Sequence, residues 1–146
     1  MPHRLLPLLL SLILLACPLA ASAGDAPAMG QADSAAIRAI ISHQLAAFLR
    51  DDGSAAFSDA SPTIQGMFGD ADTFMRMVRT GYQPVYRSSG VEFRSLGVVG
   101  GRLIQQVYIT GPDGVSVLAL YEMQRQPDGS WRINGCSIAR APDQGV

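Results

Sequence analysis

The sequence predicts one α+β domain in which N-terminal helices pack on a curved, four-stranded antiparallel sheet, in a cone-like arrangement. Three observations support this prediction. Apolar residues recur at helical spacing as far as Gly81, and from Tyr86 onward they alternate with polar residues at a period of two. The breaks between the alternating segments are short and contain glycine, which is typical of hairpins. The chain has 146 residues, which is too few for two independent cores.

The N-terminal residues 1–23 have the features of a signal peptide. Arg4 precedes a nearly pure aliphatic run, and Ala21-Ser22-Ala23 has the small-x-small pattern that signal peptidase accepts. The aliphatic run is too short to span a bilayer comfortably. We therefore expect an exported protein, in the periplasm of a Gram-negative bacterium. A second interpretation stays open, because residues 14–17 resemble a lipobox in which Cys17 is lipidated and anchors the protein to a membrane.

The composition excludes several classes of function. The formal net charge is −1, so we expect no nucleic-acid partner. All basic residues except the histidines are arginines, which excludes Schiff-base lysine chemistry and a Walker-type phosphate lysine. Beyond residue 23 only His43 and Cys136 remain as histidine and cysteine, so we expect no metal site and no cofactor.

Four helical segments are predicted. Residues 24–33 are rich in Ala, Gly and Pro and read as a flexible leader, and the domain then covers 34–140. Asp33 and Ser34 are N-cap candidates for a first helix that Gly53 would stop. Its apolar stripe consists of Ile37, Ile40, Ile41, Leu45 and Phe48.

The other helices are shorter. A segment around residues 55–60 has helical character, and Ser61-Pro62 begins a helix that ends at Gly69. Asp70 caps the last one, which Gly81 closes. A loop that contains Pro84 then leads into the sheet.

Four strands are predicted at residues 91–98, 102–110, 114–126 and 130–139. Short glycine-containing turns join them, so the sheet is predicted to be a meander. Residues 117–121 are apolar on both faces, which indicates a central strand whose second face could be buried in a homodimer. Residues 141–146 form a C-terminal tail.

Gln44 and Asp51 are the first candidate site residues. Gln44 lies inside the apolar stripe of the first helix, and a buried amide left without a partner costs about 1–3 kcal/mol. It is expected either to bond a neighbouring backbone or to point into a ligand pocket. Asp51 lies on the same face. It either pairs with an arginine or serves as a pocket carboxylate with a raised pKa, suited to general base work, while Asp52 caps the following turn.

Three tyrosines complete the candidate pocket. Tyr82 and Tyr86 flank Pro84 at the expected mouth of the cone, and Tyr121 lies in the predicted central strand. Each is expected either to line the pocket or to be an ordinary rim residue. His43 is expected in solvent, and Cys136 is expected to be a buried, inert thiol, with a reactive thiol or an intermolecular disulfide as the alternative.

Several short patterns together resemble a known family. They are Ile41-x-x-Gln44-x-x-Ala47-Phe48, Ala60-Ser61-Pro62-x-Ile64, Phe68-Gly69-Asp70, Tyr82-x-Pro84-Val85-Tyr86 and Trp131-x-Ile133-x-Gly135-Cys136. Over nearly all of residues 34–140 the chain resembles the domain of unknown function 4864 family. That family is similar, in its order of helices and strands, to the nuclear transport factor 2-like, cystatin-like superfamily of cone-shaped domains. The resemblance implies a fold and carries over no catalytic residues.

The resulting prediction is an exported, non-enzymatic binding or assembly module with a small apolar cavity, a small apolar ligand and a homodimer through the sheet. Two alternatives stay open. The first is a cofactor-free isomerase, lyase or hydrolase, with Asp51 as base and Tyr82, Tyr86 or Tyr121 as proton donor. The second is an envelope lipoprotein that recruits a protein partner, which requires lipidation of Cys17.

Overall fold

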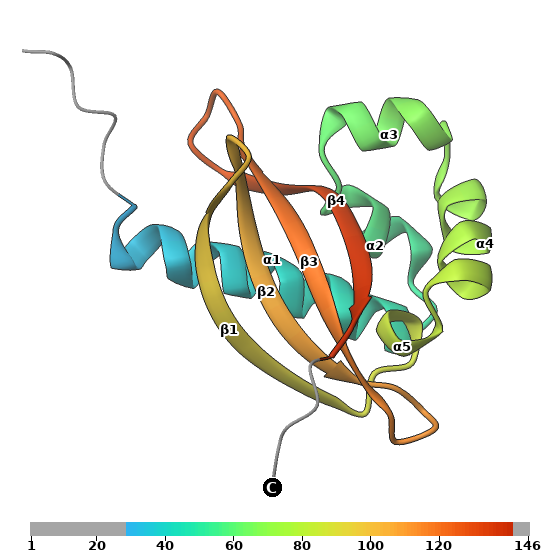
Figure 1. The fold of residues 1–146 in the computed structure, drawn as a ribbon. Coiled ribbons are helices and arrows are strands. Elements are labelled where there is room, and N and C mark those ends of the chain that lie inside the picture. The colour runs from blue at the N-terminus through green and yellow to red at the C-terminus, as the bar shows by residue number, and fades with distance from the viewer. Residues whose placement is uncertain (1–28, 142–146) are drawn as a thin grey trace, which may run out of the picture.

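The computed structural model describes residues 29–141, and the α+β class is confirmed (Figure 1). The predicted signal peptide, the lipobox and most of the leader lie outside the described residues. The helices are α1 (Gln31–Leu49), α2 (Gly53–Ser58), α3 (Pro62–Phe68), α4 (Ala71–Gly81) and α5 (Gln83–Tyr86). The strands are β1 (Gly90–Val99), β2 (Arg102–Thr110), β3 (Ser116–Arg125) and β4 (Trp131–Arg140). None of the described helices is long and apolar enough to cross a membrane.

Helix α1 begins earlier than the sequence predicted. Gly30 is its N-cap, and Asp33 lies in the first turn, where its carboxylate accepts a hydrogen bond from the Gly30 backbone N–H at 3.3 Å. The same carboxylate accepts hydrogen bonds from Arg125 and from Trp131 Nε1. Asp33 is therefore not the N-cap, and the last part of the predicted leader is helical because these contacts hold it against the sheet.

Helix α1 also ends earlier than predicted, and Gly53 does not stop it. Asp51 adopts the left-handed conformation with φ 54°, and its N–H bonds the Phe48 carbonyl at 3.0 Å, which closes the helix end. Gly53 instead begins α2, whose N-cap is Asp52, as predicted for that side chain. A Cβ at Gly53 would lie 2.9 Å from Met75 Cγ, so glycine allows α2 to approach α4 closely.

The predicted caps of α3 and α4 are confirmed. Ser61 Oγ accepts from the Ile64 N–H at 3.3 Å, and Asp70 Oδ1 accepts from the Thr73 N–H at 2.7 Å. Helix α5 was predicted to be a loop. Pro84 lies in its first turn, where the missing N–H costs nothing, so a single helical turn is compatible with this proline.

The four strands form one antiparallel sheet in the order β1-β2-β3-β4, so β3 is an interior strand as predicted. The sheet is curved, with α1 lying across one face and α2 to α5 gathered at one end (Figure 1). Backbone hydrogen bonds between Ile133 and residues Asp59 and Ser61 tie the helical end to β4.

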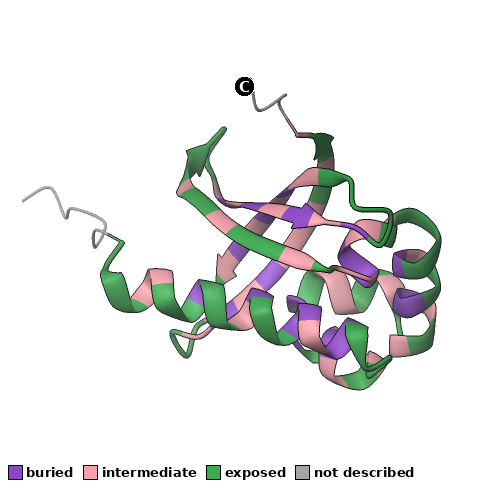
Figure 2. Cartoon of the chain, turned by 90° about the horizontal axis from the view of Figure 1, so that it is seen from below, coloured by how far each residue is buried: buried purple, intermediate pink, exposed green. Residues whose placement is uncertain are grey.

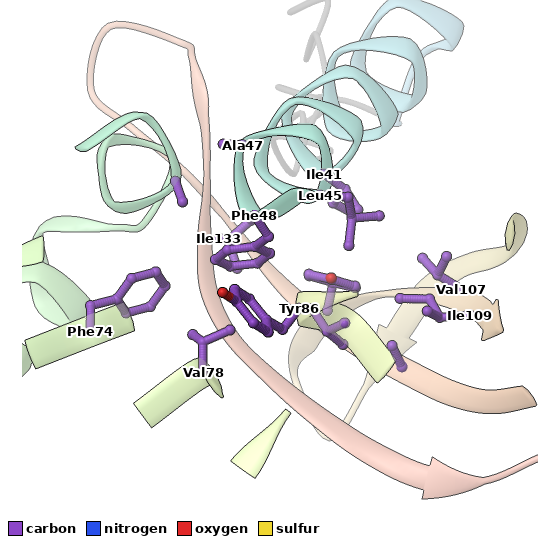
Figure 3. Close-up of a cluster of buried hydrophobic side chains, with 14 of the residues drawn as sticks. Ile41, Leu45, Ala47, Phe48, Phe74, Val78, Tyr86, Val107, Ile109 and Ile133 are labelled. Carbon is purple, nitrogen blue, oxygen red and sulfur yellow. The ribbon is translucent and has the colours of Figure 1, made fainter. Parts of the chain in front are cut away.

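The core lies between α1 and the inner face of the sheet, as Figure 2 and Figure 3 show. Ile37 and Ile41 of α1 have no exposed surface, and neither do Val107, Ile109 and Ala119 of the sheet. Burying each larger aliphatic side chain contributes about 1.5–3 kcal/mol. This packing fixes α1 on the sheet and thereby places its last turn beside the cavity described next.

Candidate functional site

A cavity of about 330 Å³ lies between the helical end of the domain and strands β3 and β4. Every helix except α2 contributes a residue to its wall. The lining residues are Gln44, Phe48, Ala60, Ile64, Met67, Phe68, Phe74, Met77, Val78, Tyr82, Val85, Tyr121, Ile133, Gly135 and Cys136. Figure 3 shows how Phe48, Phe74, Val78 and Ile133 converge from α1, α4 and β4.

The cavity walls are apolar and carry no charged side chain among the lining residues. Phe74 contacts three other aromatic rings, with centroid separations of 6.2 Å to Phe48, 5.4 Å to Phe57 and 5.6 Å to Phe68. Ile64, Met67 and Phe68 of α3 form the outer wall, and α3 has no fully buried residue. Met67 is a flexible thioether and α3 is only lightly packed, so this wall is adaptable.

Tyr121 supplies the most deeply buried polar group of the cavity. Its side chain has no exposed surface, and its hydroxyl makes no hydrogen bond of normal geometry to any residue that the structure describes. Cys136 lies opposite in the sheet register, and its thiol, a weak hydrogen-bonding group, is in contact with this hydroxyl. Burial raises the pKa of Tyr121 well above its ordinary value and raises the pKa of Cys136 to about 12. Both groups are therefore neutral at physiological pH, and the Cys136 thiol is unreactive there.

Two other polar side chains of the lining, Tyr82 and Gln44, donate hydrogen bonds to backbone carbonyls. Tyr82 donates its hydroxyl hydrogen to the Cys136 carbonyl at 2.9 Å, and burial raises its pKa. Gln44 is 4% exposed, and its Nε2 donates to the Ala56 carbonyl of α2 at 3.1 Å. The inward orientation expected for Gln44 is confirmed, and its amide both bonds a neighbouring helix and lines the cavity.

Asp51 and Tyr86, which the sequence placed in the same pocket, lie outside the cavity lining. They belong to a separate group of four side chains, Asp51, Arg79, Tyr86 and Arg87, which we call the Asp51 cluster. Tyr86 donates its hydroxyl hydrogen to the Asp51 carboxylate and accepts from Arg79 Nε at 3.2 Å and Arg87 Nη2 at 2.8 Å. Arg87 Nη2 also contacts Asp51 Oδ2 at 2.7 Å.

The raised pKa expected for Asp51 as a general base is wrong. The Tyr86 hydroxyl, the Arg87 guanidinium and the more distant Arg79 all favour the charged carboxylate and lower the pKa of Asp51. The pairing of Asp51 with an arginine, the other interpretation of the sequence, is confirmed. Arg87 Nη1 donates to the Phe48 carbonyl at 2.6 Å, so the cluster completes the C-terminal end of α1.

The pair between His43 and Asp59 was not predicted from the sequence. His43 Nδ1 lies 2.6 Å from Asp59 Oδ2. The His43 side chain is 52% exposed, as expected, but it is paired with a carboxylate. Asp59 is buried, which raises its pKa, and the contact with His43 opposes this effect. The pair joins α1 to the end of α2. Residues 29–141 hold no group of three or more His, Cys, Asp or Glu side chains that could bind a metal ion.

Comparison with known families identifies the domain. The model of a domain of unknown function (DUF4864) matches residues 30–146, so the chain belongs to this family. The match begins at the N-cap of α1 and includes every helix and strand described above. The chain matches no curated protein and no solved structure.

Proposed function

We propose that this member of the DUF4864 family is a binding module that holds a small apolar ligand in the cavity between α3 to α5 and the sheet. The observation that carries the proposal is the combination of an apolar cavity of about 330 Å³ with one buried hydroxyl, that of Tyr121, for which the described residues offer only a weak contact with the Cys136 thiol. Ligand sites are concave, mostly apolar, and contain few polar groups. The volume lies at the small end of their range.

A binding role is favoured over catalysis by the positions of the acid and base candidates. The phenol and carboxylate that do meet, Tyr86 and Asp51, are bound to two arginines outside the cavity lining. The cavity itself offers no group that is ionised near neutral pH among its lining residues. Proton abstraction from a ligand would require such a group.

Fluorescence titration with N-phenyl-1-naphthylamine, a neutral apolar probe, tests the proposal. We expect saturable binding with one site per chain. Ile64→Trp replaces an aliphatic side chain of the lining with a bulky indole and should weaken probe binding at least tenfold. Leu49→Trp, at an exposed site outside the lining, should leave probe binding unchanged. The absence of saturable binding to the wild type, or equal binding by both variants, would contradict the proposal.

An assembly role is a second candidate, and the outer face of the sheet favours it. Ile104, Leu118 and Leu120 alternate with the buried inner residues, so they lie on the face opposite α1. Figure 2 shows no described helix on that face. We propose that a second copy of the chain packs there. Sedimentation velocity at micromolar concentration should detect a dimer that Leu118→Asp dissociates, and a strictly monomeric wild type would overturn this part.

Export is proposed on the signal-like residues 1–23. Intact mass measurement on protein purified from its own envelope fraction should give a chain that begins at Gly24. A chain that begins at a lipid-modified Cys17 would identify an envelope lipoprotein instead, and a chain that retains Met1 would contradict export.

We also propose a distant relation to the nuclear transport factor 2-like superfamily. The order of helices before a curved antiparallel sheet, with the first helix across its inner face, supports it. An experimental structure that superimposes poorly on such domains would remove this relation without affecting the cavity.

A further inference from the structure

The Tyr121 hydroxyl defines the chemistry of the ligand as well as its position. We propose that the ligand is a small neutral molecule with an apolar ring or chain and one hydrogen-bond acceptor, such as a ketone or ester carbonyl, that accepts from Tyr121 Oη. This inference rests on the proposed binding function. It adds a hydrogen-bond acceptor and the absence of charge to the apolar character of the ligand.

The neutrality of the ligand follows from the cavity walls. None of the lining side chains carries a formal charge at neutral pH, and the charged side chains of the Asp51 cluster bond one another outside the lining. Moving an ionised group from water into such surroundings without a counter-ion is strongly unfavourable. A carboxylate, a phosphate or an amine at the inner end of the ligand is therefore excluded.

The choice of an acceptor follows from the groups that surround Tyr121. A phenol is a stronger hydrogen-bond donor than acceptor, and burial costs free energy when its O–H finds no partner. The structure gives no hydrogen bond from the Tyr121 O–H to the amide oxygen of Gln44 or to the oxygen of Tyr82, although both side chains line the cavity. The Cys136 thiol is a weak partner on the opposite strand. A ligand acceptor would replace this weak thiol contact with a hydrogen bond of ordinary strength.

The shape of the ligand follows from the aromatic walls. Phe48 and Phe68 both pack against Phe74 on the helical side, and Tyr82 and Tyr121 add two more rings. Offset stacking and edge contacts with such rings favour a flat, cyclic ligand. A two-ring ketone therefore suits the cavity.

Three probes of matched size test the inference by displacement of bound N-phenyl-1-naphthylamine. They are 2-acetonaphthone, 2-isopropylnaphthalene and 2-naphthoate, which share one ring system and the same number of non-hydrogen atoms. The wild type should bind the ketone about tenfold more tightly than the hydrocarbon, and the carboxylate more weakly than both. In Tyr121→Phe the ketone and the hydrocarbon should bind within about twofold of each other, with hydrocarbon affinity unchanged. Tyr108→Phe, on the outer face, is the matched control and should keep the tenfold preference.

The outcomes separate this inference from the proposed function. Binding of none of the probes overturns the binding function itself. Equal binding of ketone and hydrocarbon by the wild type, or a preference that Tyr121→Phe leaves intact, overturns the ligand class and leaves an apolar binding function standing. Tightest binding of the carboxylate overturns the neutrality of the ligand. Because the hydrocarbon reports the integrity of the cavity in every variant, a misfolded Tyr121→Phe is recognised directly.

Discussion

Tyr121 and Tyr86 are both buried tyrosines near the helical end of the domain, and their hydroxyls have opposite surroundings. Tyr86 Oη donates to a carboxylate and accepts from two guanidiniums in the Asp51 cluster. Tyr121 lines the apolar cavity, and its fully buried hydroxyl has only a weak contact with the Cys136 thiol among the described residues. We therefore expect the hydroxyl of Tyr86 to contribute to stability and the hydroxyl of Tyr121 to contribute little or to reduce it.

The surroundings of Tyr86 also show that the carboxylate of Asp51 is structural. Asp51 lies close to a phenol, as an acid–base pair would, yet its position at the end of α1 among arginines lowers its pKa. A phenol and a carboxylate in contact indicate catalysis only where a ligand can reach both. In this domain the cavity reaches Tyr121 and Tyr82, while the carboxylate lies elsewhere.

The largest expected loss of stability follows from a substitution in the Asp51 cluster. Tyr86→Phe keeps the packed ring and removes the hydroxyl that three neighbours share, so it should lower the free energy of unfolding by about 1–2 kcal/mol. Urea denaturation measures this loss. Tyr108→Phe, at a half-exposed position, should change stability by no more than about 0.5 kcal/mol. Equal effects of the two substitutions would show that the cluster does not stabilise the fold.

A smaller effect is expected where α3, the outer wall of the cavity, joins β4. Ser61 Oγ caps α3 and donates to Asn134 Oδ1 at 2.7 Å, and Ser61 has no exposed surface. Ser61→Ala should lower the free energy of unfolding by about 1 kcal/mol and weaken probe binding, because the outer wall loses its anchor. Wild-type stability and affinity in this variant would mean that α3 is held by its apolar contacts alone.

For Tyr121→Phe the account predicts no loss of stability. Removing a buried hydroxyl whose only polar contact is the weak one with the Cys136 thiol should leave the free energy of unfolding unchanged or raise it by up to about 1 kcal/mol. Urea denaturation beside Tyr86→Phe gives the comparison directly. A loss as large as that of Tyr86→Phe would indicate that Tyr121 has a structural partner.

The smallest expected effect is a change in how the free energy of unfolding depends on pH. The folded-state pKa of Asp51 is lowered, so the stability that its charge contributes is present above its unfolded pKa, near 3.8, and is lost as pH falls through the folded value. The acid side of the stability profile should therefore be shallower in Asp51→Asn than in the wild type. Unfolding midpoints measured from neutral to acid pH would show this.

Asp59 should behave in the opposite way. Its folded pKa is raised, so the stability that its protonated form contributes is present at low pH and is lost as pH rises from about 3.8 through the folded value. Asp59→Asn should make the acid side of the profile steeper. Identical profiles for Asp51→Asn and Asp59→Asn would contradict the assigned pKa directions.

The sequence predicted most elements because their signals are local. Period-two alternation and glycine turns gave the four strands, and the caps Ser61 and Asp70 gave two helix starts. The errors arose where distant contacts decide the outcome. Arg125 and Trp131 hold Asp33 and extend α1 toward the N-terminus, and Arg87 stabilises the left-handed Asp51 that ends α1 before Gly53.

The candidate site was predictable only in part for the same reason. Helical spacing placed Gln44 inside, and strand position placed Tyr121 in the interior of the sheet. Spacing also put Asp51 on the face of Gln44, but the chain leaves the helix before that residue, so the carboxylate turns to α4 and α5. The pairing of His43 with Asp59 depends on where α2 ends, which no local pattern specifies.

The most direct test of the cavity as a ligand site is a crystal structure of the protein with 2-acetonaphthone. The account predicts that the ring system lies between Phe48, Phe74 and Ile133, with the ketone oxygen about 2.5–3.0 Å from Tyr121 Oη. A ligand bound elsewhere, or a cavity closed by its own Ile64 and Met77 side chains, would contradict it.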